Sequence, residues 1–432
     1  MSKQGQISVF TAILLSMNVM VGTGILFSPS IMAAKAGNAS FLAWPLTALI
    51  FLPAVFGVSQ ISKLIPETGG VYIYSTKILG RFAGFVTGML SIVGYTLATA
   101  TVVSALRIAM AQNFPTVIMF QSPVAFGIMA IASICMFNLI STQAFGKIQG
   151  PATIVKLIPI FLLIAFLPLI TRRWLPIVAP DAMSLPSSLT LAIFSYFGFE
   201  YACNIGHHLP NKRDISKVIF LAFGGTALIY TLFHFGLLQL MGIKSLVAYS
   251  ATSFPKFLPI PFVGVKSMVV AFTSIAILLT YFFSANGMFF SNVALFGQMN
   301  KGGFISGSKV LGRNNRFAQP WPFVILQGAV VFGFVTMVNN VKALADMSNI
   351  TVFGSVLSVM IALYVIQKRR GAGPLEMISA IGGILSAGGL VSYSIWQLTQ
   401  GRIGVGIIIP MLLVLLGCLA LYKNQPIVEE IK

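Results

Sequence analysis

Apolar stretches long enough to cross a bilayer recur along this sequence, and short polar linkers separate them. A membrane-spanning helix needs about 20 apolar residues, which is close to the length of these stretches. Only 8% of the residues are charged, whereas a soluble domain carries about a quarter. No stretch alternates apolar and polar residues as the strands of an outer-membrane barrel do. We therefore predict an all-α integral membrane protein.

The apolar pattern predicts twelve transmembrane segments in one domain that covers residues 1–432. The predicted segments are 9–33, 40–62, 82–111, 123–141, 148–171, 187–206, 217–240, 263–297, 320–339, 346–366, 374–396 and 403–422.

The net charge of +19 indicates an orientation in the membrane rather than a nucleic-acid partner. The Lys and Arg residues lie in short loops, 17 on the side of both termini and 8 on the other, with Arg107 and Lys156 inside segments. Cytoplasmic loops carry the excess of positive charge. We expect a cytoplasmic (inner) membrane location with both termini in the cytoplasm, and no nucleic-acid binding.

Two segments carry an interruption at a comparable depth. The first contains Gly22-Thr23-Gly24 near its middle, and the sixth contains the run from Ser195 to Glu200. These segments lie five apart and run in opposite directions, as an inverted repeat of five helices would place them. We expect a first repeat at 9–171, a second at 187–366, and two extra helices at 374–422.

The glycines of the first interruption favour an unwound turn. Each glycine costs about 1 kcal/mol relative to alanine within a helix. Backbone N–H groups freed at the start of a half-helix suit a carboxylate, and freed carbonyls suit an ammonium group. The alternative is a packing site, because small residues are common where membrane helices touch. A second row of small residues, Gly80, Gly84 and Gly88, indicates close packing of this kind.

Two ionisable residues fall inside predicted segments. Glu200 is the one acid placed deep in the membrane, where such a group is costly and usually functional. Lys156 lies in the cytoplasmic half of the fifth segment and suits a fixed cation or a proton carrier, although it could instead extend to the interface. We interpret both as candidates for coupling or gating.

The sequence shows no motif for a metal site, a disulfide, catalysis or a cofactor. The three cysteines show no metal or disulfide spacing, and His207 and His208 lack a third ligand type nearby. No nucleophile elbow, phosphate-binding loop or dinucleotide fingerprint occurs. We expect neither an enzyme nor a bound cofactor or metal, and transport would use a gradient or exchange instead of ATP.

Three short motifs carry a resemblance that covers nearly the whole chain. They run from Met20 to Ile25, from Pro66 to Gly70, and from Phe194 through Glu200 to Ile215. In this order and spacing they resemble the amino acid–polyamine–organocation transporter superfamily, with its bacterial amino acid permease and arginine/agmatine antiporter branches. The resemblance implies twelve helices, a LeuT-like five-plus-five inverted repeat and alternating access.

The resemblance also implies roles for individual residues. Backbone N–H groups of the first interruption would hold a substrate carboxylate, and carbonyls of Met20, Phe194 and Phe197 would hold an α-amino group. Phe194 would also serve as a gating aromatic, while Glu200 and Lys156 would act in coupling. The implied substrate-binding residues are Met20, Gly22, Thr23, Gly24, Ile25, Tyr95, Thr99, Phe194, Ser195, Phe197, Gly198 and Tyr281.

The function predicted from these features is secondary active transport of amino acids, by exchange or by coupling to protons. A charged Lys156 would repel a sodium ion at the position it resembles, which disfavours sodium coupling. Two alternatives stay open: an antiporter of an amino acid against its decarboxylated amine, and a membrane sensor that binds without transport. The expected partners are the small-molecule substrate, protons and the lipid bilayer, and a homodimer stays open.

Overall fold

The computed structural model describes residues 8–65, 70–140, 142–170, 184–200, 209, 211, 214–306, 308–338, 340–399, 411 and 414–422. In these ranges the regular structure is helical, apart from two isolated β-bridges, so the predicted all-α class is confirmed. The named helices are α1 (Val9–Met20), α2 (Gly24–Ala36), η1 (Gly37–Leu42), α3 (Ala43–Leu64), α4 (Val71–Leu79), α5 (Arg81–Asn113), α6 (Ile118–Gln121), α7 (Pro123–Asn138), α8 (Thr142–Ile170), η2 (Pro186–Ser188), α9 (Leu189–Ser195), α11 (Ile215–Tyr249), η5 (Ala251–Phe257), α12 (Val263–Lys301), α13 (Ser308–Leu311), α14 (Trp321–Met337), α15 (Val341–Arg369) and α16 (Pro374–Thr399).

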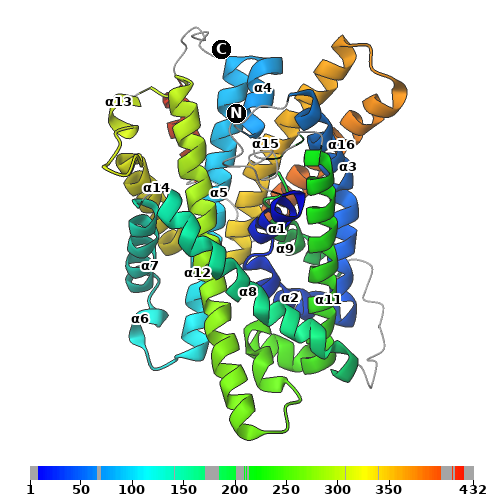
Figure 1. Cartoon of the computed structure of the whole chain (residues 1–432), viewed down its shortest axis with the longest axis vertical. Helices are drawn as coiled ribbons and strands as arrows, with labels where there is room; N and C mark the ends of the chain where they lie inside the picture. Colours follow the sequence, from blue (N-terminus) through cyan, green and yellow to red (C-terminus); the bar gives the residue numbers. More distant parts are fainter. Residues whose placement is uncertain are drawn as a thin grey trace.

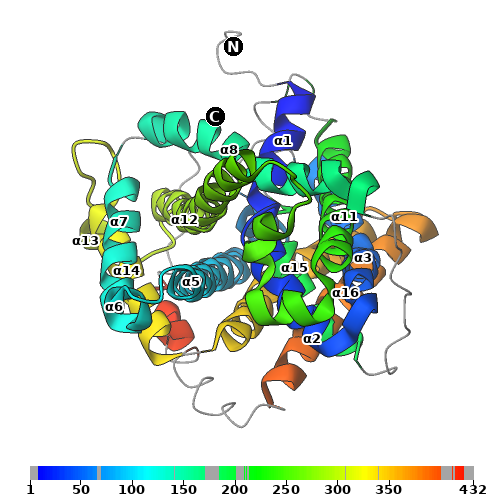
Figure 2. The same cartoon turned by 90° about the horizontal axis from the view of Figure 1, so that it is seen from below.

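Long helices surround short, broken ones. In Figure 1, α5, α11 and α12 run along the vertical axis, and α1 and α9 lie among them near mid-height. Helix α11 packs against α1, α2 and α3, while α9 packs against α2, α3 and α15. Figure 2 shows α5 from its end, with α12 and α14 beside it. Helix α9 and the end of α1 at Met20 are therefore buried within the bundle, whereas the start of α1 is exposed at its edge, with Phe10 68% exposed.

The helices coincide with most of the predicted segments. Six helical stretches are long and apolar enough to cross a membrane, and three shorter apolar helices accompany them in the described part of the chain. The first predicted segment is two helices, α1 and α2, separated by Val21, Gly22 and Thr23. The sixth and twelfth segments lie partly outside the described residues, at 201–208 and 400–410. A multi-pass membrane protein follows, whereas the count of twelve and the repeat stay predictions.

The surface of the bundle is apolar and its interior holds polar side chains. Leu49, Ile128 and Leu385 are 64%, 59% and 70% exposed on α3, α7 and α16. Thr99 and Asn286, by contrast, are completely buried on α5 and α12. A surface of this kind suits lipid, because hydrocarbon chains solvate apolar side chains and polar groups must find partners inside.

Helix α15 begins earlier than predicted, at Val341 instead of residue 346. Asn340 caps it by accepting a hydrogen bond from the N–H of Ala343 at 3.1 Å. The earlier start puts Asp346 inside the helix, where it is 1% exposed and pairs with Lys342 at 2.8 Å. Glu200 and Asp346 are thus both buried acids, and the prediction that Glu200 alone lies deep in the membrane stays a prediction.

The row of small residues at the start of α5 permits close packing, as predicted. A β-carbon at Gly84 would lie 2.8 Å from the β-carbon and 2.9 Å from the α-carbon of Thr76 on α4. At Gly88 it would lie 2.4 Å from the sulfur of Met299 on α12. Gly80 has open space and a φ of +99°, so it serves the turn between α4 and α5. The contact at Gly84 is the least adaptable, because backbone atoms form part of it.

We expect Gly84→Ala to destabilise the protein by about 1–3 kcal/mol, the usual cost of overpacking. The measurement is thermal unfolding of the purified protein in lipid nanodiscs. Gly224→Ala on α11 is the matched control, because no atom lies within 4 Å of the added β-carbon. Equal unfolding temperatures for the two variants would contradict the packing role of Gly84.

Candidate functional site

The break between α1 and α2 leaves backbone donors without partners. Its first two N–H groups are satisfied locally, since Val21 donates to Met17 O at 2.6 Å and Gly22 to Met20 O at 2.7 Å. The N–H groups of Thr23, Gly24 and Ile25 donate to no acceptor among the described residues. Orphan donors at a helix start form an anion-binding site, which the helix dipole reinforces.

The second break follows α9. The helix ends at Ser195 and the chain continues as a turn from Tyr196 to Glu200. Gly198 has a φ of +98°, a left-handed conformation that glycine adopts without strain. The segment after Glu200, which includes His207 and His208, lies outside the described residues.

The two breaks touch each other through their smallest residues. A β-carbon at Gly24 would lie 2.0 Å from Ser195 Oγ and 3.1 Å from Ser195 Cα. A β-carbon at Gly198 would lie 2.4 Å from Cγ1 of Val19, near the end of α1. Each break therefore needs a glycine where it meets the other broken helix. At Gly22 the corresponding distance to Ser284 Oγ is 3.2 Å, which is tight but adaptable.

Tyr230 of α11 links the two broken helices. Its hydroxyl lies 2.5 Å from Met20 O at the end of α1 and 2.8 Å from Ser195 O at the end of α9. A tyrosine hydroxyl has one proton to donate, so it serves two carbonyls with a single donor. The sequence did not indicate this residue, because a tyrosine within a long apolar helix has no local signature.

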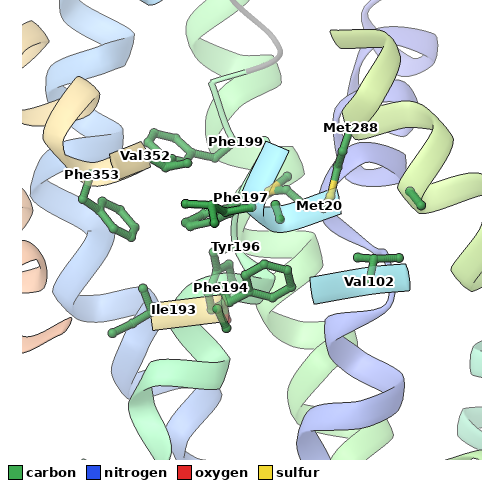
Figure 3. Packing of buried hydrophobic residues seen from close by; sticks show 14 of the residues in the cluster. Met20, Val102, Ile193, Phe194, Tyr196, Phe197, Phe199, Met288, Val352 and Phe353 are labelled. Atoms are coloured by element: carbon green, nitrogen blue, oxygen red, sulfur yellow. The ribbon is translucent and has the colours of Figure 1, made fainter. Parts of the chain in front are cut away.

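Aromatic side chains enclose the breaks. The ring of Phe194 lies 6.0 Å from that of Phe27 and 5.3 Å from that of Phe197, between ring centroids. Phe197 continues the contact to Tyr95 on α5 at 6.5 Å and to Phe353 on α15 at 5.6 Å. Figure 3 shows the rings of Phe194 and Phe197 near each other. The described walls near the breaks are thus mainly aromatic and aliphatic.

Two of the predicted site residues, Glu200 and Tyr95, are in contact in the structure. The Tyr95 hydroxyl donates to Oε1 of Glu200. Oε2 of Glu200 is buried and accepts no hydrogen bond from the described residues. This contact joins α5 to the second break, which gives the glutamate a position at the border of the site.

Lys156 is buried within the bundle rather than extended to an interface. It is 2% exposed on α8, which packs against α11 and α12. The hydroxyl of Thr280 on α12 lies 3.5 Å from Lys156 O, and Ser284, which faces Gly22, follows one turn later. One face of α12 therefore connects the turn of Lys156 with the first break.

Two predicted pocket residues are buried but are not joined to the breaks. Thr99 on α5 donates to Tyr95 O within its own helix at 2.8 Å. Tyr281 on α12 is 1% exposed. No hydrogen bond or ring contact among the described residues connects either side chain to a break. The motif from Pro66 to Gly69 lies outside the described residues.

Comparison with known proteins matches the sequence of this chain to one family. The family profile described as "Amino acid permease" matches residues 7–416. A serine/threonine exchanger from Bacillus subtilis is 24% identical, over 84% of each chain. An aspartate–proton symporter from the same organism is 28% identical over 54% of this chain and 48% of its own. An arginine/ornithine antiporter from Latilactobacillus sakei is 24% identical over about half of each chain (52% and 51%).

These relatives are named as transporters, and the profile covers nearly the whole chain, including both breaks. The chain therefore belongs to the amino acid permease family, within the amino acid–polyamine–organocation superfamily, and is a multi-pass transport protein of the membrane.

Proposed function

We propose that this protein carries an amino acid across the cytoplasmic membrane by alternating access, with the substrate backbone bound between the two breaks. The three unpartnered N–H groups of Thr23, Gly24 and Ile25 are the observation that carries the proposal. They lie at the start of α2, where the helix dipole adds to the attraction for a carboxylate. The substrate carboxylate is their proposed occupant.

The α-amino group is assigned to the carbonyls at the ends of α1 and α9. Met20 O and Ser195 O share the single proton of the Tyr230 hydroxyl. Met20 O also accepts from the N–H of Gly22 at 2.7 Å, so Ser195 O is the carbonyl that loses its donor when the tyrosine serves Met20. An ammonium group has several N–H donors and would serve whichever carbonyl the tyrosine leaves. Substrate binding would then complete the hydrogen bonds of both breaks at once.

The side-chain pocket is proposed to favour a neutral amino acid. Phe27, Phe194 and Phe197 offer apolar surface beside the breaks. Glu200 is the acid nearest to the second break, and the Tyr95 hydroxyl already occupies one of its oxygens. A cationic side chain would need a dedicated counter-charge, because burying an unpaired charge is costly.

The proposed architecture has twelve helices, an inverted repeat at 9–171 and 187–366, and both termini in the cytoplasm. The break in α1–α2 and the break after α9 support the repeat, because each interrupts the first helix of its half. The excess of Lys and Arg on the side of the termini supports the orientation.

Exchange is the coupling we place first, because the relative aligned over 84% of the chain is named an exchanger of serine and threonine. Proton coupling is the second candidate. It is favoured by two buried ionisable groups, Glu200 in the second break and Lys156 on α8, which are 8% and 2% exposed. Buried ionisable groups within a membrane protein commonly mark proton or ion pathways.

The first prediction concerns exchange in proteoliposomes. Uptake of labelled serine should be several-fold faster into vesicles preloaded with serine than into empty ones. The reason is that the binding site of an exchanger turns back to the outside only when it carries a substrate from the inside. The control for side-chain charge is labelled arginine added to vesicles preloaded with arginine. We expect its uptake to be slow. Uptake into empty vesicles without any gradient would exclude obligatory exchange, and binding without uptake would favour the sensor alternative.

The second prediction tests the contact between the breaks. Gly24→Ala should weaken amino acid binding by about 10- to 100-fold, because the added methyl displaces Ser195 at a cost of roughly 1–3 kcal/mol. The double variant Gly24→Ala/Ser195→Gly removes the clashing side chain and should recover part of the affinity. Binding is measured by calorimetry on protein whose unfolding temperature has been checked. Unchanged affinity of the single variant would contradict the assigned site.

The third prediction separates proton coupling from exchange. If Glu200 carries the coupled proton, Glu200→Gln should abolish uptake driven by an imposed pH gradient while preloaded exchange continues. Glutamine keeps an oxygen that accepts from the Tyr95 hydroxyl, so the local contact is preserved. Tyr95→Phe is the matched control, since it breaks the contact and leaves the carboxyl group. Gradient-driven uptake by Glu200→Gln at the wild-type rate would exclude Glu200 as the coupling group.

A further inference from the structure

The linker between α12 and α14, residues 301–320, carries positive charge only. It holds four basic residues and no acid. Their side chains are exposed and form no ion pair with a described residue: Lys301, Lys309, Arg313 and Arg316. Other basic stretches are partly neutralised, since Lys217 pairs with Asp214 at 3.0 Å and Arg370 pairs with Glu376. The positive charge of the 301–320 linker is thus available to a partner outside the described chain.

This linker lies at the periphery of the bundle. In Figure 1, its short helix α13 lies at the end of the bundle that also holds α4. Figure 2 places α13 at the edge, on the side of α7 and α14 and opposite α11. In the proposed orientation this end meets the cytoplasmic leaflet. The exposed groups of the linker therefore face lipid headgroups and not the breaks.

Exposed apolar side chains accompany the basic ones. Val310, Phe317 and Trp321 are 69%, 39% and 41% exposed. Trp321 is the first residue of α14, where the polar linker meets the apolar helix, and tryptophan concentrates at membrane–water interfaces. The guanidinium group of Arg316 lies 4.6 Å from the centroid of the Phe317 ring. Cationic and apolar groups thus lie together, as a phospholipid with a phosphate above its acyl chains requires.

Hydrogen bonds fasten the linker to the bundle near both of its ends. Nδ2 of Asn315 donates to Leu139 O at the end of α7 at 2.8 Å, and its Oδ1 accepts from the N–H of Phe317 at 2.9 Å. The N–H of Ser306 donates to Leu421 O at 2.6 Å. A surface whose backbone is already ordered loses less entropy when it binds a partner.

We infer that the 301–320 linker is a docking surface for anionic phospholipids. Lys309, Arg313 and Arg316 bind the phosphate groups, because ammonium and guanidinium groups donate charge-assisted hydrogen bonds to phosphate oxygens. Phe317 and Trp321 contact the upper part of the acyl chains. A zwitterionic phospholipid binds more weakly, because its headgroup carries a cation beside the phosphate. Each basic group near an anionic membrane surface strengthens binding by about 5-fold.

The test is crosslinking by light with phosphatidylglycerol that carries a diazirine near the headgroup end of one acyl chain. Phosphatidylcholine with the same diazirine is the control probe. The full-length protein is held in phosphatidylcholine nanodiscs, and labelled peptides are mapped by mass spectrometry. The anionic probe should label residues 302–321 at least 5-fold more than the zwitterionic probe. Because a nanodisc offers each probe to both leaflets, the result does not depend on the orientation in the cell or on the transported solute.

The variant Lys309→Gln/Arg313→Gln/Arg316→Gln should reduce labelling of the linker by the anionic probe at least 10-fold. It should unfold at the wild-type temperature in phosphatidylcholine, because the three side chains are exposed and make no hydrogen bond with a described residue. Added phosphatidylglycerol should raise the unfolding temperature of wild type more than that of this variant.

The matched control is Lys368→Gln/Arg369→Gln/Arg370→Gln, which removes three exposed charges at the end of α15. Its linker should be labelled as strongly as that of wild type. An equal loss in the control would assign the effect to overall surface charge and overturn the inference. Equal labelling by the two probes, or full labelling of the linker variant, would also overturn it. Displacement of the anionic probe by soluble glycerol 3-phosphate would assign the surface to a free phosphate ester instead of a lipid.

Discussion

The close approach of the two broken helices is the constraint on which the rest of the structure depends. Gly24 has no room for a β-carbon against Ser195, and Gly198 has none against Val19, so each break fixes the position of the other. In a membrane, backbone groups freed by a break must find partners inside the protein or face a cavity. The enclosing helices therefore have two tasks, to keep lipid away from the breaks and to supply donors and acceptors to them. Tyr230 performs the second task for both broken helices from one side chain of α11.

This shared donor gives the site a physical reason to respond to a ligand. The Tyr230 hydroxyl has one proton for two carbonyls, and of these Met20 O also accepts from the N–H of Gly22 while Ser195 O depends on the tyrosine. Three N–H groups at the start of α2 have no partner among the described residues. A molecule with a carboxylate and an ammonium group one carbon apart complements both deficits. An amino acid bound as proposed would thus supply hydrogen-bond partners to both breaks, whereas a molecule with only one of the two groups would supply partners to one of them.

The helices and the first break could be predicted from the sequence, because each has a local signature. Apolar length marks a membrane helix directly, and Gly22-Thr23-Gly24 marks a break because glycine is costly in a helix. Residues whose role depends on contacts with distant parts of the chain could not be predicted in this way. Tyr230 lies in an apolar helix, and its role depends on its contacts with two carbonyls from other helices. The start of α15 was misplaced for a local reason, because the cap at Asn340 begins the helix earlier than hydropathy predicted. The alignment of Thr99 and Tyr281 with pocket positions stays a prediction.

Hydrogen-bond satisfaction separates structural polar residues from functional candidates. His234 on α11 is fully buried and would attract attention on composition alone. Yet its Nδ1 accepts from Trp44 Nε1 at 2.9 Å and its Nε2 lies 3.1 Å from Ser40 Oγ, which fixes one neutral tautomer with both nitrogens occupied. Such a residue is best understood as an anchor between α11, η1 and α3. The N–H groups of Thr23, Gly24 and Ile25 show the opposite condition. Because leaving a buried polar group unsatisfied costs about 1–3 kcal/mol, a carboxylate bound there as proposed would gain free energy.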